Sequence, residues 1–404
     1  MLERCKTATF TVEGSEMKPS KRYPAPPFTT STLQQEAGRK FSMSVSQTMS
    51  IAQKLYERGL ITYMRTDSVN LSDLALNSCK KEICDMFGEK YSSRRNYTTS
   101  SKGAQEAHEA IRPTYIDNHT IEGTAAEKKL YELIWKRTVA SQMVAADLDR
   151  TTIAIDIDGT SWQFVATGEV VRFDGFLRLY SESVDEDAAA ENSEAILPKM
   201  EVGAEVQSSQ IVATERFSMA PARYNEASLV KRMEELGIGR PSTYAPTITT
   251  IINRGYVVKQ NKDAQKRQYT ALTLSSAGKI SEKTLTESYG KEKNRLAPTD
   301  IGMVVNDYLE TQFSSIMDYH FTANVEKEFD RVAEGDITWT DMIRDFYDPF
   351  HKLVDCAVGT QSDRSVQSVR VLGVDPKSGC TVKARIGRYG PMVELEAEDG
   401  GKGQ

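Results

Sequence analysis

The sequence lacks any long apolar run. No stretch of about 18 consecutive apolar residues occurs in the 404-residue chain, so no membrane-spanning helix is predicted. Residues 1–6 lack the apolar segment of a secretory signal. The five cysteines include no Cys-x-x-Cys pair, which argues for a reducing compartment and against a zinc site. These absences predict a cytoplasmic protein without membrane contact, and no pattern demands more than a monomer.

The chain has no excess of positive charge: 51 lysines and arginines stand against 57 aspartates and glutamates, a formal net charge of −6. Residues 181–205 alone hold eight acidic side chains and one lysine, a net charge of −7. The rest of the chain is therefore close to +1 and has room for local basic surfaces, so a nucleic-acid partner is not excluded. The 39% hydrophobic content predicts a globular protein, and the length suits several domains.

Residues 59–68 (GLITYMRTDS) are the most informative stretch. A helix is expected before Gly59 and a short apolar strand at Leu60 and Ile61, after which Tyr63 is followed at once by Arg65 and a carboxylate. A phenol beside a cation suits attack on a phosphodiester, with the guanidinium holding the phosphate oxygens. The alternative is a buried tyrosine at the end of a strand, with a surface arginine and a helix cap.

The helix before Gly59 presents two polar side chains on one face. Ser44 is its expected cap, and the apolar positions Val45, Met49, Ala52 and Tyr56 follow helical spacing. Gln53 and Glu57 lie one turn apart, and they belong either to a binding pocket or to a solvated face.

His108 and Glu109 invite comparison with a zinc protease motif. That motif needs a second histidine where this chain has Arg112, so the zinc interpretation fails. We expect His108 and Arg112 to lie about one helical turn apart and to donate to phosphate oxygens, with Pro113 ending the turn. A structural histidine is the alternative.

Residues 225–274 predict a separate nucleic-acid-binding module. Two helices flank a Gly-Ile-Gly turn at 237–239, with Pro241 at the start of the second helix. Residues 256–259 and 268–274 are expected to pair as a hairpin wing. The order of helix, Arg-Gly and apolar strand is the same here as around Tyr63. We therefore expect two related modules.

Four side chains of this module offer hydrogen-bond donors to a sugar–phosphate backbone. They are Arg240, Ser242, Thr243 and Arg254. The alternative, a helix N-terminus with capping hydroxyls, explains Ser242 and Thr243 but not the arginine.

Six segments together resemble the type IA DNA topoisomerases, the single-strand-passing enzymes. Besides residues 59–68, the resemblance rests on residues 26–37, 108–114, 237–245 with 254–256, 298–302 and 321–326. It covers most of residues 1–350. It implies transient cleavage of one DNA strand through a 5′-phosphotyrosine, strand passage and religation, which relax negatively supercoiled DNA without ATP.

The resemblance also implies roles for individual residues. Tyr63 is the nucleophile, and Arg65 and His108 assist at the phosphate. The DNA-binding positions would be Gln53, Glu57, Arg112, Thr114, Arg240, Ser242, Thr243 and Arg254. Family members bind Mg²⁺ in an N-terminal TOPRIM domain, which this sequence does not contain, so no metal site is expected here. The chain is accordingly interpreted as a core fragment that binds single-stranded and negatively supercoiled DNA, associates with the nucleoid, and is catalytically incomplete.

The predicted architecture is a multidomain α+β protein. Mostly helical, winged-helix-like domains are joined by an antiparallel β arch as part of a toroidal core. The expected segments are 1–27 (an arch strand and a Pro-rich connector from residue 18), 28–149 (helical, with Tyr63), 150–222 (arch with an acidic insertion), 223–358 (helical, DNA-binding) and 359–404 (linker and the start of a β repeat).

Two other functions remain open at this point. A non-catalytic winged-helix DNA-binding protein explains residues 225–274 but gives the Tyr63 stretch no role. A metal-dependent phosphodiesterase would need clustered carboxylates and would hydrolyse the bond instead of rejoining it.

Overall fold

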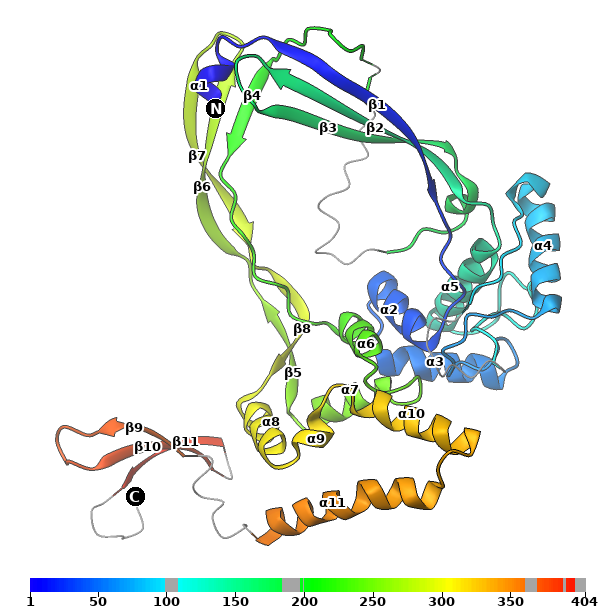
Figure 1. The fold of residues 1–404 in the computed structure, drawn as a ribbon, viewed down its shortest axis with the longest axis vertical. Coiled ribbons are helices and arrows are strands. Elements are labelled where there is room, and N and C mark those ends of the chain that lie inside the picture. Colours follow the sequence, from blue (N-terminus) through cyan, green and yellow to red (C-terminus); the bar gives the residue numbers. More distant parts are fainter. Residues whose placement is uncertain (99–107, 184–196, 199, 360–368, 388–389, 397–404) are drawn as a thin grey trace. The chain divides into compact units, whose positions relative to one another are not determined.

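A computed structural model describes residues 1–98, 108–183, 197–198, 200–359, 369–387 and 390–396 (Figure 1). The acidic insertion at 184–196 lies outside these described residues. The chain forms two compact units, which are treated separately below. The first comprises Met1–Glu234, Arg240–Ile248 and Gln260–Leu296, and the second comprises Glu235–Gly239, Thr249–Lys259 and Ala297–Gln404. No helix among the described residues is long and apolar enough to cross a membrane.

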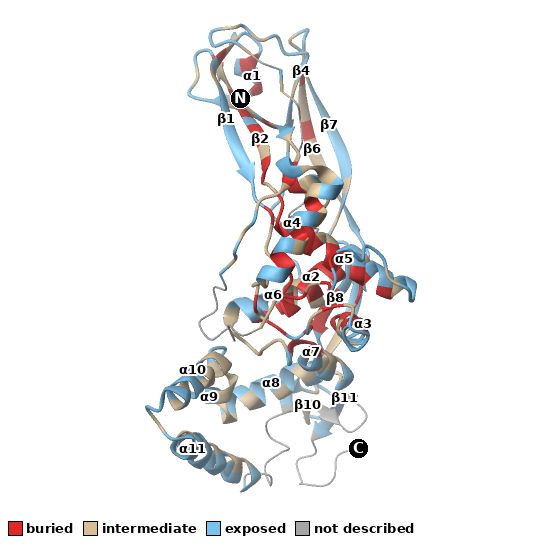
Figure 2. Cartoon of the chain, turned by 90° about the vertical axis from the view of Figure 1, so that its right-hand side faces the viewer, coloured by how far each residue is buried: buried red, intermediate tan, exposed pale blue. Residues whose placement is uncertain are grey.

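Four helices build the main core of the first unit. They are α2 (Thr30–Phe41), α3 (Val45–Glu57), α4 (Asp73–Phe87) and α5 (Ala125–Ser141). Thr29, Ser44, Ser72 and Thr124 cap their N-termini through side-chain oxygens. The predicted cap at Ser44 is thus confirmed. The buried residues of Figure 2 concentrate here, and they include Phe28, Leu33, Leu55, Ile134 and Met143.

The predicted apolar face of α3 is partly wrong. Its buried positions are Val45, Thr48, Ile51, Ala52 and Leu55, whereas Tyr56 is 39% exposed. The helix therefore turns Tyr56 toward solvent instead of into the core.

A three-stranded antiparallel sheet has the order β1–β2–β3, with β1 (Phe10–Arg22), β2 (Ala146–Ile157) and β3 (Gln163–Phe173). The expectation that a Pro-rich connector begins at Lys18 is wrong, because β1 continues to Arg22 and Pro19 lies opposite Asp149. Proline is tolerated there since β1 is an edge strand of the sheet.

A second antiparallel sheet has the order β4–β6–β7, with β4 (Gln210–Thr214), β6 (Gln265–Ser275) and β7 (Ile280–Tyr289). The predicted hairpin wing is wrong, because β5 (Val257–Lys262) pairs with β8 (Glu292–Pro298) while β6 pairs with β4 and β7. A small apolar core links this sheet to the first one, through Leu2, Cys5, Ile157 and Leu274. The expectation of antiparallel sheets is confirmed.

Two helix pairs share the same hydrogen bonds to distant main-chain groups, as expected for related modules. One pair is α2 and α3; the other is α6 (Glu226–Leu236) and α7 (Tyr244–Asn253). The Ile111 amide donates to the Phe28 carbonyl over 2.8 Å, and the Leu296 amide donates to the Tyr224 carbonyl over 2.7 Å. Each carbonyl immediately precedes the N-cap region of the first helix of its pair.

The end of the second helix repeats as well. Gly59 and Gly255 both take positive φ, at +69° and +70°, which glycine adopts without steric cost. The amides of Thr114 and Thr299 donate over 3.0 Å to the carbonyls of Leu60 and Tyr256, the residues after these glycines. The two modules are therefore related in local structure, as predicted.

The remaining short elements of the chain are α1 (Leu2–Cys5), η1 (Glu89–Tyr91) and η2 (Gly175–Arg178). The second unit contains α8 (Asp300–Gln312), α9 (Ser314–Met317), α10 (Phe321–Glu334) and α11 (Trp339–Gly359), and a sheet of β9 (Val369–Val374), β10 (Thr381–Gly387) and β11 (Gly390–Glu396).

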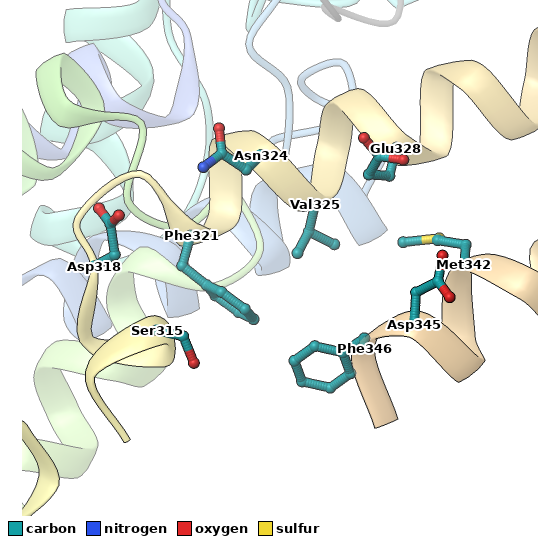
Figure 3. A pocket seen from close by; sticks show the side chains of 9 residues that line it. All are labelled: Ser315, Asp318, Phe321, Asn324, Val325, Glu328, Met342, Asp345 and Phe346. Atoms are coloured by element: carbon teal, nitrogen blue, oxygen red, sulfur yellow. The ribbon is translucent and has the colours of Figure 1, made fainter. Parts of the chain in front are cut away.

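None of the described residues in α8–α11 is fully buried. A cavity of about 410 Å³ lies among α9, α10 and α11, and the rings of Phe321 and Phe346 face it, 5.9 Å apart between centroids (Figure 3). Residues 300–359 carry thirteen acidic and four basic side chains. These residues therefore carry a formal net charge of −9.

Candidate active site

The main chain around Tyr63 is fixed on one side by Thr30, the first residue of α2. The Thr30 amide donates to the Thr66 carbonyl over 2.9 Å, and the Thr66 amide donates to Thr30 Oγ1 over 2.9 Å. The same hydroxyl lies 2.8 Å from the Met64 carbonyl oxygen. All of these groups are buried, so water does not compete for them.

The other side is fixed by Thr62, the residue before Tyr63. Its amide donates to the Arg112 carbonyl over 2.9 Å, its hydroxyl donates to the Ala110 carbonyl over 2.7 Å, and the Arg112 amide donates to the hydroxyl over 3.0 Å. The predicted strand at residues 60–61 is only an isolated bridge between Ile61 and Pro113. A loop held at both ends, not a strand, presents Tyr63.

Burial alternates along this loop and sorts its side chains. Met64, Thr66 and Ser68 are buried, whereas Tyr63 and Arg65 are exposed and Asp67 is half-buried. The phenol, guanidinium and carboxylate therefore project on the outer side. Arg65 forms no ion pair within the part of the chain that the structure describes. Its charge is available for an anionic ligand.

Tyr56 contacts Tyr63 and was not foreseen as a site residue. The two ring centroids lie 5.3 Å apart with the rings at 68°, an edge-to-face geometry. Helical spacing had placed Tyr56 on the core face of α3. The signal that could have revealed it is its position in the last turn of α3, seven residues before Tyr63.

Gln53 and Glu57 lie on the same face of α3, as predicted. Gln53 Nε2 donates to Glu57 Oε1 over 2.7 Å. Gln53, Glu57 and Tyr56 all lie in the last turns of α3.

The predicted helical turn at residues 108–112 is wrong, because this segment is extended and forms bridges at Ile111 and Pro113. Arg112 instead binds Glu109, at 2.6 Å from Nη2 and 3.0 Å from Nε. Glu109 also accepts from the Ser72 amide over 2.7 Å. Burial alone would raise the pKa of Glu109, but the hydrogen bonds from Ser72 and the charge of Arg112 outweigh it and lower the pKa. Arg112 is thus committed to a structural pair.

His108 and Thr114 lie at the two ends of this extended segment. His108 is half-buried and has no side-chain partner among the described residues. Thr114 is exposed, and its amide donates to Leu60 over 3.0 Å. Main-chain hydrogen bonds at Leu60 and Thr62 join this segment to the loop that carries Tyr63. His108 and Thr114 are therefore linked to the same loop.

The second module reaches the same loop through Tyr244. This buried side chain has its pKa raised to about 12, chiefly by burial and further by the charges of Glu234 and Asp67, while Arg240 opposes the shift. Arg240 and Asp67 therefore both act electrostatically on the Tyr244 hydroxyl.

Thr243 uses its hydroxyl within the turn before α7. It accepts from the Arg240 amide, three residues earlier in the chain, over 2.8 Å. Ser242 is exposed beside it. Arg254 is exposed in the second unit. The four predicted donors of this module are thus divided between the two units.

The related module has no phenol at the corresponding place. Tyr63 stands four residues after Gly59, and the residue four after Gly255 is Lys259. Only the first module therefore offers a tyrosine nucleophile.

Among the described residues, no group of three or more His, Cys, Asp or Glu side chains could hold a metal ion. Mg²⁺ prefers several oxygen ligands in octahedral geometry, and these residues offer no such set. The site described above therefore consists of the Tyr63 phenol, the Arg65 guanidinium, the His108 imidazole and main-chain supports.

Comparisons with known proteins place the chain in one family. The family model described as DNA topoisomerase matches residues 1–277 and 273–344. The prokaryotic-type DNA topoisomerase 1 of Acanthamoeba polyphaga mimivirus is 42% identical over 417 residues, covering 98% of this chain and 48% of that protein. DNA topoisomerase 1 of Xylella fastidiosa strain Temecula1 is 42% identical over 409 residues, covering 95% and 45%.

The solved structure of full-length topoisomerase I from Thermotoga maritima is similar in fold. It superposes with a TM-score of 0.71 at 32% identity, covering 99% of this chain and 60% of that one. The chain spans about half the length of the curated relatives it matches. On its family match, its relatives and its fold, the chain belongs to the type IA DNA topoisomerases.

Proposed function

We propose that this chain supplies the nucleophile of an enzyme that cuts, passes and rejoins one strand of DNA. The observation that carries the proposal is the exposed Tyr63 beside an unpaired Arg65, on a loop fixed by Thr30 and Thr62. A nucleophile held on both sides needs little reorganisation to reach an attacking position.

The cleavage step is a transesterification. The Tyr63 oxygen attacks the phosphorus of a single-strand phosphodiester, the bond to the 3′ oxygen breaks, and that oxygen leaves with a proton as a 3′ hydroxyl. The DNA end remains on the enzyme as a 5′-phosphotyrosine. One ester replaces another, so religation reverses the step without ATP.

Two side chains suit the charge that builds on the phosphate. Arg65 offsets negative charge on the non-bridging oxygens, and His108 donates a hydrogen bond to one of them. An ordinary phenol has a pKa near 10, so Tyr63 must also lose a proton to a base. No step here is assigned to Mg²⁺, because the described residues offer no set of ligands for it.

DNA binding is assigned to the outer side of the loop and the start of α7. Gln53, Glu57 and Thr114 border the strand near Tyr63, and Arg240 and Ser242 hold its backbone. Arg112 contributes through its position against Thr62. A toroidal arrangement of domains, opened to let a second strand through, completes the proposed relaxation of negatively supercoiled DNA.

The test compares the chain alone with a joined enzyme, in which this chain replaces the matching segment of the Xylella fastidiosa relative. Each is mixed with a single-stranded oligonucleotide labelled at its 3′ end, and the products are run on native and denaturing gels. We expect a native shift without a stable adduct for the chain alone, and a denaturation-resistant adduct for the joined enzyme. An equal amount of adduct after Tyr63→Phe in the joined enzyme would refute the assignment.

A further inference from the structure

Four exposed lysines surround the point where the strand pair β5–β8 continues into the pair β6–β7. These residues, Lys262, Lys266, Lys291 and Lys293, are called the basic junction below. None of them forms an ion pair with another described residue. All four belong to the first unit, as do Phe217, Arg267 and Tyr289.

The strand register brings the two connectors of the junction together. β5 ends at Lys262 and β6 begins at Gln265, while β7 ends at Tyr289 and β8 begins at Glu292. Gln265 lies opposite Tyr289 in the β6–β7 pair, and the Asn294 amide donates to Asn261 Oδ1 over 2.8 Å. The connectors 263–264 and 290–291 are therefore neighbours, and the lysines at their ends share one small surface.

Charge on this part of the chain is positive although the whole chain is acidic. Residues 260–295 hold eight basic and four acidic side chains, against a formal net charge of −6 for the protein. One of those acids, Glu287, is engaged by Arg267 over 2.5 Å. Unpaired lysines at this density attract phosphates, and ammonium groups hold them without reading the base sequence.

An aromatic cluster adjoins the junction. The Arg267 guanidinium lies 4.1 Å from the Phe217 ring centroid and 4.5 Å from that of Tyr289. Phe217 is nevertheless 41% exposed, so part of its ring remains open to a ligand. Lys266 and Arg267 are adjacent in β6, so their side chains project from opposite faces of the strand. Cations beside an open aromatic ring are the combination that holds unpaired nucleotides.

We propose that the basic junction, with Phe217, binds a segment of single-stranded DNA other than the one held at Tyr63. This inference rests on the proposed function, because strand passage handles a second strand besides the cleaved one. Lysines that contact phosphates and a ring that stacks on any base suit a strand of arbitrary sequence. The cleaved strand occupies the Tyr63 loop, and the junction is assigned to the strand that passes.

The test measures binding of the complete chain to a fluorescent single-stranded oligonucleotide by anisotropy over a series of salt concentrations. The variant carries Lys262→Gln, Lys266→Gln, Lys291→Gln and Lys293→Gln. We expect a loss of affinity of about tenfold or more at low salt, and a slope of log K against log salt that falls by roughly 0.7 for each lost contact. Phe217→Ala should weaken binding at every salt concentration while leaving the slope unchanged.

The matched control removes the same charge elsewhere, through Lys80→Gln, Lys81→Gln, Lys327→Gln and Lys352→Gln, all exposed positions. It should bind as the unsubstituted chain does. Equal affinity for the junction variant and the unsubstituted chain, or equal losses in junction and control variants, would overturn the proposal. Equal binding of a DNA duplex with the same dependence on the junction would overturn the assignment to single strands.

Tyr63→Phe separates this inference from the proposed function. The substitution removes the nucleophile but no phosphate contact of the junction, so the effect of the four lysines should persist in its presence. Circular dichroism and thermal unfolding confirm that each variant is folded, and Lys291→Gln alone provides a milder change in a connector should the fourfold variant unfold.

Discussion

Thr30 and Thr66 exchange hydrogen bonds in both directions, and this pair ties α2 to the loop that carries Tyr63. The Thr30 amide donates to the Thr66 carbonyl, and the Thr66 amide donates to the Thr30 hydroxyl, each over 2.9 Å. Both side chains are buried. The hydroxyl of one residue thus fixes main-chain groups on the far side of Tyr63.

Replacing that hydroxyl by a methyl group should loosen the loop. In Thr30→Val the buried amide of Thr66 loses its acceptor, at a cost of about 1–3 kcal/mol. Hydrogen–deuterium exchange of peptides covering residues 60–68 should become faster while exchange in α5 is unchanged. Thr7→Val, at an exposed position, serves as the control. Unchanged exchange at residues 60–68 would mean that Thr30 does not hold the loop.

The ring of Tyr56 should orient the nucleophile. Edge-to-face pairs contribute about 0.5–1.5 kcal/mol beyond area burial, so Tyr56→Ala should slow adduct formation by the joined enzyme roughly twofold to tenfold. Tyr56→Phe keeps the ring and should react at the normal rate. Equal slowing by both substitutions would assign the effect to the Tyr56 hydroxyl instead of to ring packing.

The Glu109 carboxylate should contribute stability that depends on pH. Its pKa in the folded chain lies below the ordinary value of 4.5, so the contribution is present above that value and is lost as pH falls through the lowered pKa. Glu109→Gln should therefore lower the thermal midpoint clearly at pH 7, where hydrogen bonds to a charged partner are worth about 1.5–3 kcal/mol. The difference from the unsubstituted chain should shrink in strongly acidic buffer. A difference that is the same at both pH values would show that the charge of Glu109 is not involved.

Gly302 should tolerate no side chain. A Cβ atom at this position would stand 2.1 Å from the Tyr256 carbonyl oxygen, to which the Thr299 amide donates over 3.0 Å. Gly302→Ala should destabilise the second unit by about 1–3 kcal/mol, the usual cost of overpacking. Gly359→Ala, where a Cβ would meet no atom within 4 Å, should be nearly neutral. Urea unfolding followed by Trp339 fluorescence compares the two variants.

The sequence was informative where local chemistry decides structure. Ser44 predicted a helix start correctly, and the Arg-Gly repeat predicted two related modules. Strand pairing was less accessible, because nothing near β5 indicates that its partner is β8 and not the adjacent β6. Pro19 was misleading for a similar reason, since only the order of the sheet shows that β1 is an edge strand.

The same limit applies to the candidate site. The alternation of exposed and buried side chains from Tyr63 to Ser68 is a local property of the loop. The residue types in this loop had suggested attack on a phosphodiester. The supports of the loop come from Thr30 and from residues 110–112, far away in the sequence, and helical spacing alone assigned Tyr56 to the core. Long-range contacts such as these follow from tertiary packing, which periodicity does not encode.

The most direct measurement is the mass of tyrosine peptides after the joined enzyme has reacted with single-stranded DNA and been digested with nuclease and protease. Tyr56 and Tyr63 are neighbouring, exposed phenols, so the experiment distinguishes between them. We predict a nucleotide remnant on the peptide at Tyr63, its loss in Tyr63→Phe and its retention in Tyr56→Phe. A remnant on Tyr56, or on any other residue when Tyr63 is intact, would contradict the account.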